Sequence, residues 1–294
     1  MELIEKLHTQ ITNKQHNILI HIYRFRFLNR HHIQTLLRHK DYKRVNVWLK
    51  DLLEKGYIER IYSTSMPENT KPAIYYLGKY GRRVLQQAEP SHMTDFEEVG
   101  AEYTIEAEDV RKLYKDKDRK EAFRLDCLAI ADCFIAIDKS VDRNEKRLKV
   151  ATHNEREQYN YVEQIKPDLF IYTIPVNEEY DPETFVFKDE ETFFLYYISN
   201  RKLRKYIGYR IAHICNIILT DDNIADEQQY AKQTVLFIAA TIPLRNYAMS
   251  IVKRRLNNMY GSNKITFKFT TLDEFKKQGL YKTNWKILTA SSEE

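Results

Sequence analysis

The chain has 294 residues and a net charge of +5, and this length favours two domains because single hydrophobic cores stop growing near roughly 250 residues. Its 43% hydrophobic and 30% charged residues, with only 7 glycines and 7 prolines, exclude collagen-like, low-complexity and globally disordered chains. No apolar run is long enough for a membrane helix, and three scattered cysteines cannot form a disulfide framework or a four-ligand zinc site, so we expect a cytoplasmic protein.

Charge is distributed unevenly along the chain. Residues 1–90 hold 16 Lys and Arg against 8 Asp and Glu, a balance of +8, whereas residues 91–294 have a balance of −3. A basic block joined to a nearly neutral one indicates that the first block meets a polyanion, most often nucleic acid. The alternative is a solvated basic face, and the order of the predicted elements decides between the two.

The first 92 residues are predicted to form a winged helix-turn-helix domain. Helices are expected over 13–26, from Asn29 for a short stretch, from Asp41 to Gly56 and over 79–87, with β-rich segments over 57–62 and 73–77 around a polar loop. Thr12 and Gln15 have the spacing of a capping box for the first helix, and Gly56 suits the left-handed residue after the third. Three helices followed by a two-stranded wing are typical of this domain.

The third helix has two distinct faces at 100° per residue. Its core face is expected to hold Val45, Leu49, Leu52 and Leu53. The opposite face at its N-terminal half is what a helix-turn-helix lays into the major groove, where Asn46 can pair with adenine and Val47 can touch a thymine methyl. The predicted DNA-binding residues, wing included, are His39, Lys40, Tyr42, Lys43, Arg44, Asn46, Val47, Lys50, Arg60 and Lys71. A winged helix that serves as a protein-interaction module is the alternative.

Residues 93–294 are predicted to form a second, larger domain after a polar boundary around Ala88–Asp95. Expected helices are 96–114, 203–218, 244–258 and a short one from Leu272; expected strands are 128–137, 169–174, 192–198, 234–240 and 265–269, with a charged turn over 115–120. This order implies an α+β or α/β fold with a mixed sheet covered by helices.

Several kinds of chemistry are absent from the sequence of this second domain. Its glycines are isolated, so no phosphate-binding loop is present, and it holds no paired His or Cys cluster. We therefore expect no nucleotide cofactor and no metal.

One local arrangement in the second domain resembles a known fold. Pro167 and Asp168 stand at the head of an apolar strand, and a second apolar strand over 193–198 follows about 25 residues later. From Pro167-Asp168 onward the predicted elements follow in the order strand, strand, helix, strand and helix, and this order resembles the PD-(D/E)xK nuclease fold. The wing followed by this domain resembles the replication-relaxation family of plasmids and integrative elements. The C-terminal end of that family is similar to three segments here: the strand 234–241, the helix 245–258 and residues 270–273. The resemblance covers roughly residues 12–275.

The resemblance implies a metal site that this sequence has lost. The nuclease fold uses an Asp and an acid on the next strand to hold Mg²⁺, with a Lys two residues on that polarises the attacking water. Asp168 fits the first position, but Tyr196 and Tyr197 stand where the second acid is expected and Ser199 where the Lys is expected. Tyrosine is a poor Mg²⁺ ligand because its phenol stays protonated at neutral pH.

No catalytic residue is therefore assigned, and Asp168 and Tyr196 mark a degenerate position. We expect Asp168 to cap a turn rather than ligate metal, although Glu102 or Glu191 could in principle substitute for the missing acid. Replacing Tyr196 by glutamate is expected to restore a carboxylate pair but not the lysine.

The sequence thus predicts a non-catalytic protein of a plasmid or other mobile element that binds double-stranded DNA and acts in replication, DNA relaxation or transfer. The second domain is expected to make it a homodimer and to dock a relaxase or replication initiator, with no membrane partner. Two alternatives remain: a metal-dependent nicking nuclease or relaxase, and a plain transcription regulator. Cleavage of supercoiled plasmid separates the nuclease from the others.

Overall fold

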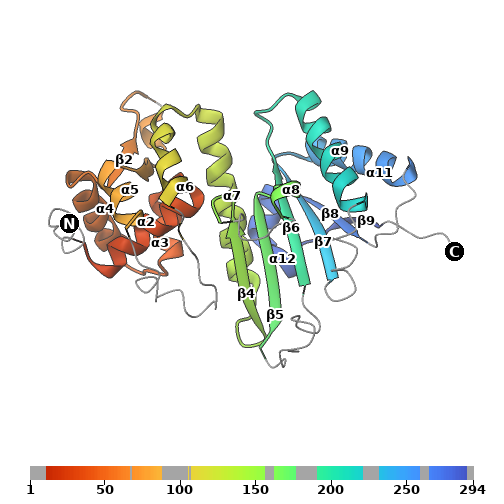
Figure 1. Cartoon of the computed structure of the whole chain (residues 1–294), viewed down its shortest axis with the longest axis horizontal. Coiled ribbons are helices and arrows are strands. Elements are labelled where there is room, and N and C mark those ends of the chain that lie inside the picture. The colour runs from red at the N-terminus through yellow and green to blue at the C-terminus, as the bar shows by residue number, and fades with distance from the viewer. Residues whose placement is uncertain are drawn as a thin grey trace. The chain divides into compact units, whose positions relative to one another are not determined.

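The computed structural model describes residues 11–66, 68–87, 105, 107–155, 162–176, 191–220, 232–258 and 265–289. The chain divides into two compact units, Met1–Ile135 and Ala136–Glu294 (Figure 1). The stretch Ala88–Asp95, where the domain boundary is predicted, lies outside the described residues. The coarse prediction of the fold is confirmed, because N-terminal helices with a small sheet are followed by a six-stranded mixed sheet with helices.

The first unit opens with three helices whose caps follow from the sequence. They are α2 (Asn13–Phe25), α3 (Arg30–Leu36) and α4 (Tyr42–Glu54). The predicted capping box is confirmed: the Gln15 backbone N–H donates to the Thr12 hydroxyl at 3.3 Å, and the Thr12 N–H donates to the Gln15 amide oxygen at 2.9 Å. Asp41 caps α4 by accepting the Lys43 backbone N–H at 2.8 Å. These caps satisfy N–H groups that a helix start leaves without partners.

The core of the first unit is built from the apolar stripes of these helices. The fully buried side chains of α2 include Ile18, Leu19 and Ile22. In α4 the inward face is confirmed for Val45, Leu49 and Leu52, while Leu53 is half-buried. Gly56 after α4 has a φ of +72°, the left-handed conformation that glycine adopts without steric cost. The buried stripe orients α4 so that its other side faces outward.

A small antiparallel sheet follows the helices. Its strands are β1 (Leu28–Asn29), β2 (Ile58–Ile61) and β3 (Ile74–Leu77), in the order β1-β3-β2, and α5 (Lys79–Leu85) comes next. The predicted hairpin is β2 and β3, and a short 3-10 helix, η1 (Glu68–Thr70), lies in its loop. β1 was not predicted because a strand of two residues carries no periodic signal.

The segment after α5 differs from the prediction. The expected helix over 96–114 is described only from Ala107, where α6 (Ala107–Lys112) leads into a 3-10 helix, η3 (Leu113–Asp118), in place of most of the expected turn. The strand predicted over 128–137 is wrong, since these residues lie within the 20-residue helix α7 (Glu121–Ser140). A short apolar run does not separate strand from helix, and the run's three alanines favour helix.

The helices after α5 extend the first unit to Ile135 and pack on its N-terminal helices. The Arg26 guanidinium forms an ion pair with the buried carboxylate of Asp116 in η3. On α7, Phe134 packs on Phe25 with ring centroids 5.2 Å apart, and the His32 imidazole lies 3.2 Å from the Asp132 carboxylate. Residues beyond the predicted end of the first domain at position 92 thus contribute to its packing.

The second unit is built on a six-stranded sheet. Its strands are β4 (Lys146–Thr152), β5 (Leu169–Pro175), β6 (Glu191–Ile198), β7 (Lys232–Ala239), β8 (Thr266–Thr271) and β9 (Lys286–Thr289), in that spatial order. The central pairs β6–β7 and β7–β8 are parallel, and the outer pairs are antiparallel (Figure 1). The carboxyl ends of β6 and β7 therefore lie at the same edge as the start of β5.

Helices cover both faces of this sheet. On one face, α9 (Arg204–Thr220) and α11 (Ile242–Asn258) bury isoleucines and leucines against aromatic side chains of β5 to β8, among them Phe194, Phe237 and Phe267. The short α8 (Val162–Ile165), which precedes β5, contacts α9, and its Ile165 belongs to the same core. On the other face, α12 (Leu272–Lys282) contacts β7 and β8. Gly279 in α12 has a φ of +71° and lies against Ser140, where a Cβ would stand 2.3 Å from the serine side chain.

Most predicted elements of the second unit are confirmed, with three omissions. The strands at 169–174, 192–198, 234–240 and 265–269 and the helices at 203–218 and 244–258 match the structure within a few residues. The edge strands β4 and β9 and the short helix α8 were not predicted, because α8 and β9 span only four residues each and the first four residues of β4 include three charged ones. Among the described residues, no helix is long and apolar enough to cross a membrane.

Candidate nucleic-acid interface

The N-terminal half of α4 presents most of the predicted DNA-binding residues on one exposed surface. The exposed side chains are Tyr42, Lys43, Arg44, Asn46 and Val47 in that half and Lys50 just beyond it. We call this set the α4 face. Val47 is 64% exposed although it is apolar, and Tyr42 is 49% exposed. An exposed valine between cations has no packing role, and a contact with a base methyl is one use for it.

The turn before α4 orients two further predicted residues. Lys40 is exposed, whereas His39 is half-buried, with its ring 5.0 Å from the Trp48 ring in an edge-on contact. The His39 ring nitrogen Nδ1 also lies 3.0 Å from the Asp41 carbonyl oxygen. His39 therefore holds the turn as well as bordering the α4 face, so its contribution to binding and its contribution to folding are linked.

Arg60 and Lys71 come from the hairpin rather than from α4. Both are exposed, Arg60 on β2 and Lys71 in the loop before β3. The Arg60 guanidinium lies 5.8 Å from the centre of the Tyr62 ring. The two residues thus form a separate part of the predicted interface, on the hairpin of β2 and β3.

One cation beside α4 was not predicted from the sequence. The guanidinium of Arg30, at the first position of α3, lies 5.7 Å from the centre of the Tyr42 ring. This contact places a positive charge next to the α4 face. The contact could not be predicted because it joins residues twelve positions apart on two helices whose relative orientation is set by packing.

The position predicted to be a degenerate metal site, Asp168 and Tyr196, lies in the second unit, and both side chains have protein partners. Asp168 accepts a hydrogen bond from the Tyr197 backbone N–H at 2.7 Å and an ion-paired one from the Arg210 guanidinium at 2.9 Å. Its own backbone N–H donates to the Leu195 carbonyl at 2.8 Å. The carboxylate therefore joins β5, β6 and α9, a larger role than the turn cap that was predicted.

Tyr196 and Glu191 do not complete a metal site with Asp168. Tyr196 is 1% exposed and its hydroxyl donates to the Ile165 carbonyl at 2.8 Å. Glu191 lies at the opposite end of β6, in an ion pair with Lys146 and a 3.0 Å hydrogen bond from Tyr281. Burial opposes ionisation of Glu191, but the hydrogen bond and charge of Lys146 outweigh it and lower the pKa of the carboxyl.

No other group replaces the missing ligands within the described residues. There, no cluster of three or more His, Cys, Asp and Glu side chains is placed to share a metal ion. Glu102, the other predicted substitute, lies outside the described residues.

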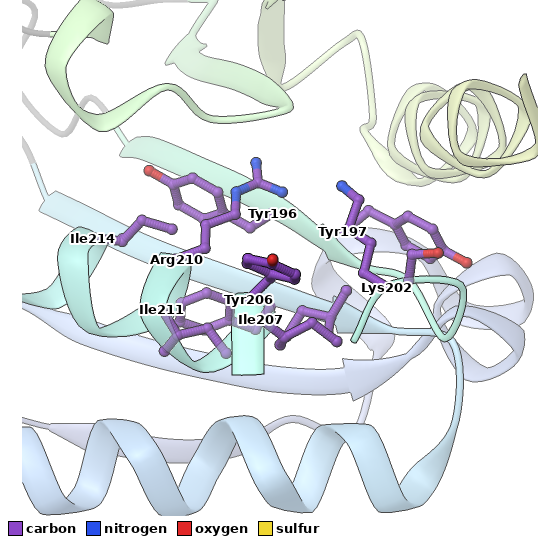
Figure 2. Close-up of a pocket in the computed structure, with 11 residues that line it drawn as sticks. Tyr196, Tyr197, Lys202, Tyr206, Ile207, Arg210, Ile211 and Ile214 are labelled. Carbon is purple, nitrogen blue, oxygen red and sulfur yellow. The ribbon is translucent and has the colours of Figure 1, made fainter. Parts of the chain in front are cut away.

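A pocket of about 150 Å³ lies beside this position, between the carboxyl end of β6 and α9. Its walls include Tyr196, Phe237 and isoleucines of α9, while Lys202 and Arg210 bring positive charge to it. In Figure 2, Tyr206 projects between Arg210 and Lys202. The pocket thus combines apolar and aromatic walls with cations.

Comparison with known proteins gives one family match. The sequence model of a family described as Replication-relaxation matches residues 19–217, which is about two thirds of the chain and extends from α2 into α9. Neither the curated proteins nor the solved structures contain a match to the chain.

Proposed function

Because the chain belongs to the replication-relaxation family, we propose that it is a double-stranded DNA-binding protein of a plasmid or other mobile element that acts in replication without catalysis of its own. In this proposal the first unit works as a winged helix-turn-helix, and α4 is its recognition helix. The second unit is a nuclease-like domain that has lost its metal site.

The observation that carries the proposal is the composition and exposure of the α4 face. Lys43, Arg44 and Lys50 can each reach a phosphate or a guanine edge, and Asn46 can pair bidentately with adenine. Lys50 faces Glu54 at 3.7 Å, but both side chains are more than 60% exposed, so this pair is weak and leaves Lys50 available to a phosphate. Residues 1–90, which contain the α4 face, have a charge balance of +8, which supports attraction to DNA over a long range.

The direct test is duplex binding by the full-length protein in a salt series. The full chain is used because the first unit includes η3 and most of α7, so a fragment ending near residue 92 would lose the Arg26–Asp116 ion pair. Affinity is expected to fall steeply as salt rises, because each cation that meets a phosphate releases counterions. If the protein binds no duplex at low salt, the proposal that it binds double-stranded DNA is wrong.

We expect no cleavage of DNA by this protein. Supercoiled plasmid should stay intact with Mg²⁺ or Mn²⁺, even when it carries the protein's own binding site, because Asp168 is held by Arg210 and the Tyr197 N–H and has no acidic partner. The Asp168→Ala variant should lose about 2 kcal/mol of stability, since two donors lose a charged acceptor, and should bind duplex DNA as the wild type does. Metal-dependent nicking that disappears in Asp168→Ala would instead establish the enzyme.

We also propose that the protein acts as a homodimer, with the second unit as the source of the contact. A single recognition helix covers a short site, so specific binders of this kind usually pair two on a symmetric sequence. Light scattering of the full chain should give a mass near twice 35.3 kDa. A mass of one chain at tens of micromolar would contradict dimerisation. Docking of a relaxase or replication initiator on the same unit is a further part of the proposal.

A further inference from the structure

The outward side of α9 differs in character from its buried side. Ile207, Ile211 and Ile214 are buried against the sheet. About 140° of the opposite side holds Lys205, Tyr206, Tyr209, Arg210 and His213, taking 100° per residue. Tyr206 is 64% exposed and Tyr209 is 62% exposed, so two aromatic rings three residues apart face outward. We call Lys205, Tyr206 and Tyr209, together with the exposed Lys202 two residues before α9, the α9 face.

Charge on this segment has a single sign. Residues 199–220 include five Lys and Arg and no Asp or Glu, although residues 91–294 as a whole have a balance of −3. The Lys205 ammonium lies 5.7 Å from the centre of the Tyr209 ring, so cation and ring are neighbours on the surface. A local basic segment in an otherwise nearly neutral region selects an anionic partner.

The pocket beside the α9 face indicates which kind of anionic partner fits this surface. Tyr206 and Lys202 belong to both, and the pocket walls are mainly apolar and aromatic (Figure 2). A partner that carries a flat aromatic ring next to a negative charge fits this combination of cations, exposed tyrosine rings and an apolar pocket. An acidic protein segment would satisfy the cations but would make no use of the two exposed rings or of the pocket.

We propose that the α9 face binds single-stranded DNA, with phosphates at Lys202 and Lys205, bases stacked on Tyr206 and Tyr209, and one base at the pocket. Unpaired bases expose the ring faces that exposed tyrosines stack on, whereas a duplex keeps its bases stacked on one another. This surface lies on the second unit and is distinct from the α4 face. The inference therefore goes beyond the proposed duplex binding and does not depend on it.

The test measures binding of full-length protein to a fluorescent oligothymidylate of about 20 nucleotides by anisotropy. Tyr206→Ala and Tyr209→Ala are each expected to weaken binding by on the order of 10-fold, because each removes one stacking platform. Tyr206→Phe and Tyr209→Phe are the matched controls and should retain the wild-type affinity, since phenylalanine keeps the ring. Both tyrosines are exposed, so the variants should fold normally, which thermal unfolding verifies.

Three results would overturn the proposal. Equal affinity of the alanine variants and the wild type would show that the rings do not stack on bases. Complete loss of oligothymidylate binding in the Lys43→Glu/Arg44→Glu protein, whose α9 face is intact, would place single-strand binding on α4. Competition by thymidine monophosphate or by a polyglutamate peptide as strong as that by the oligonucleotide would assign the surface to a small nucleotide or to an acidic protein.

Discussion

The Lys43→Glu/Arg44→Glu double variant is expected to lose duplex DNA binding by at least about 100-fold at moderate salt, because two phosphate contacts become repulsions and fewer counterions are released. Both side chains are exposed and lie in the first turn of α4. Glutamate is favourable near a helix N-terminus, so the variant should fold as the wild type does. Fluorescence anisotropy with a labelled duplex, measured beside thermal unfolding, gives both quantities.

The matched control reverses the same charge elsewhere on the first unit. Lys79 and Arg83 are exposed on α5, and the Lys79→Glu/Arg83→Glu variant changes the net charge by the same amount. It should lose far less affinity than the α4 variant if binding depends on position rather than on total charge. Equal losses in the two variants would reduce the interaction to general electrostatic attraction. Asn46→Ala should mainly relax the preference among duplex sequences.

The Tyr196→Glu variant is expected to destabilise the second unit by about 3–5 kcal/mol rather than to rebuild a metal site. The sequence suggested that a glutamate here would stand beside Asp168 as a second carboxylate. The structure adds a cost to this change, because Tyr196 is 1% exposed and stacks on Phe237 with ring centroids 5.6 Å apart. Glutamate would leave a cavity at that ring and bury a charge. Chemical denaturation followed by circular dichroism measures the loss.

The Tyr196→Phe variant separates the hydroxyl from the ring. It retains the stack on Phe237 and removes only the 2.8 Å hydrogen bond to the Ile165 carbonyl, so we expect a loss of about 1 kcal/mol. A Tyr196→Glu protein that unfolds like the wild type and cleaves DNA with Mg²⁺ would show that the site is open to metal after all.

Local elements with clear start and stop signals were predictable from the sequence. The caps at Thr12 and Asp41 and the glycine after α4 mark helix ends through contacts with near neighbours, so they need no knowledge of the rest of the chain. The error at 128–137 has the opposite cause. An apolar run of ten residues suits a buried strand and a buried helix equally, and packing on Phe25 and His32 accompanies the helix.

The two candidate sites also differ in whether the sequence or only the tertiary structure determines them. The sequence by itself determined the α4 face, because its exposed residues belong to one helix and its periodicity separates them from the buried stripe. Only the tertiary structure decided the state of Asp168, since Arg210 stands 42 positions away and reaches it through the packing of α9 on the sheet. It also decided that Tyr196 belongs to the core and that Tyr206 and Tyr209 do not. Residues on one helix are related by a constant rotation, whereas contacts between elements depend on register and packing, which no local pattern encodes.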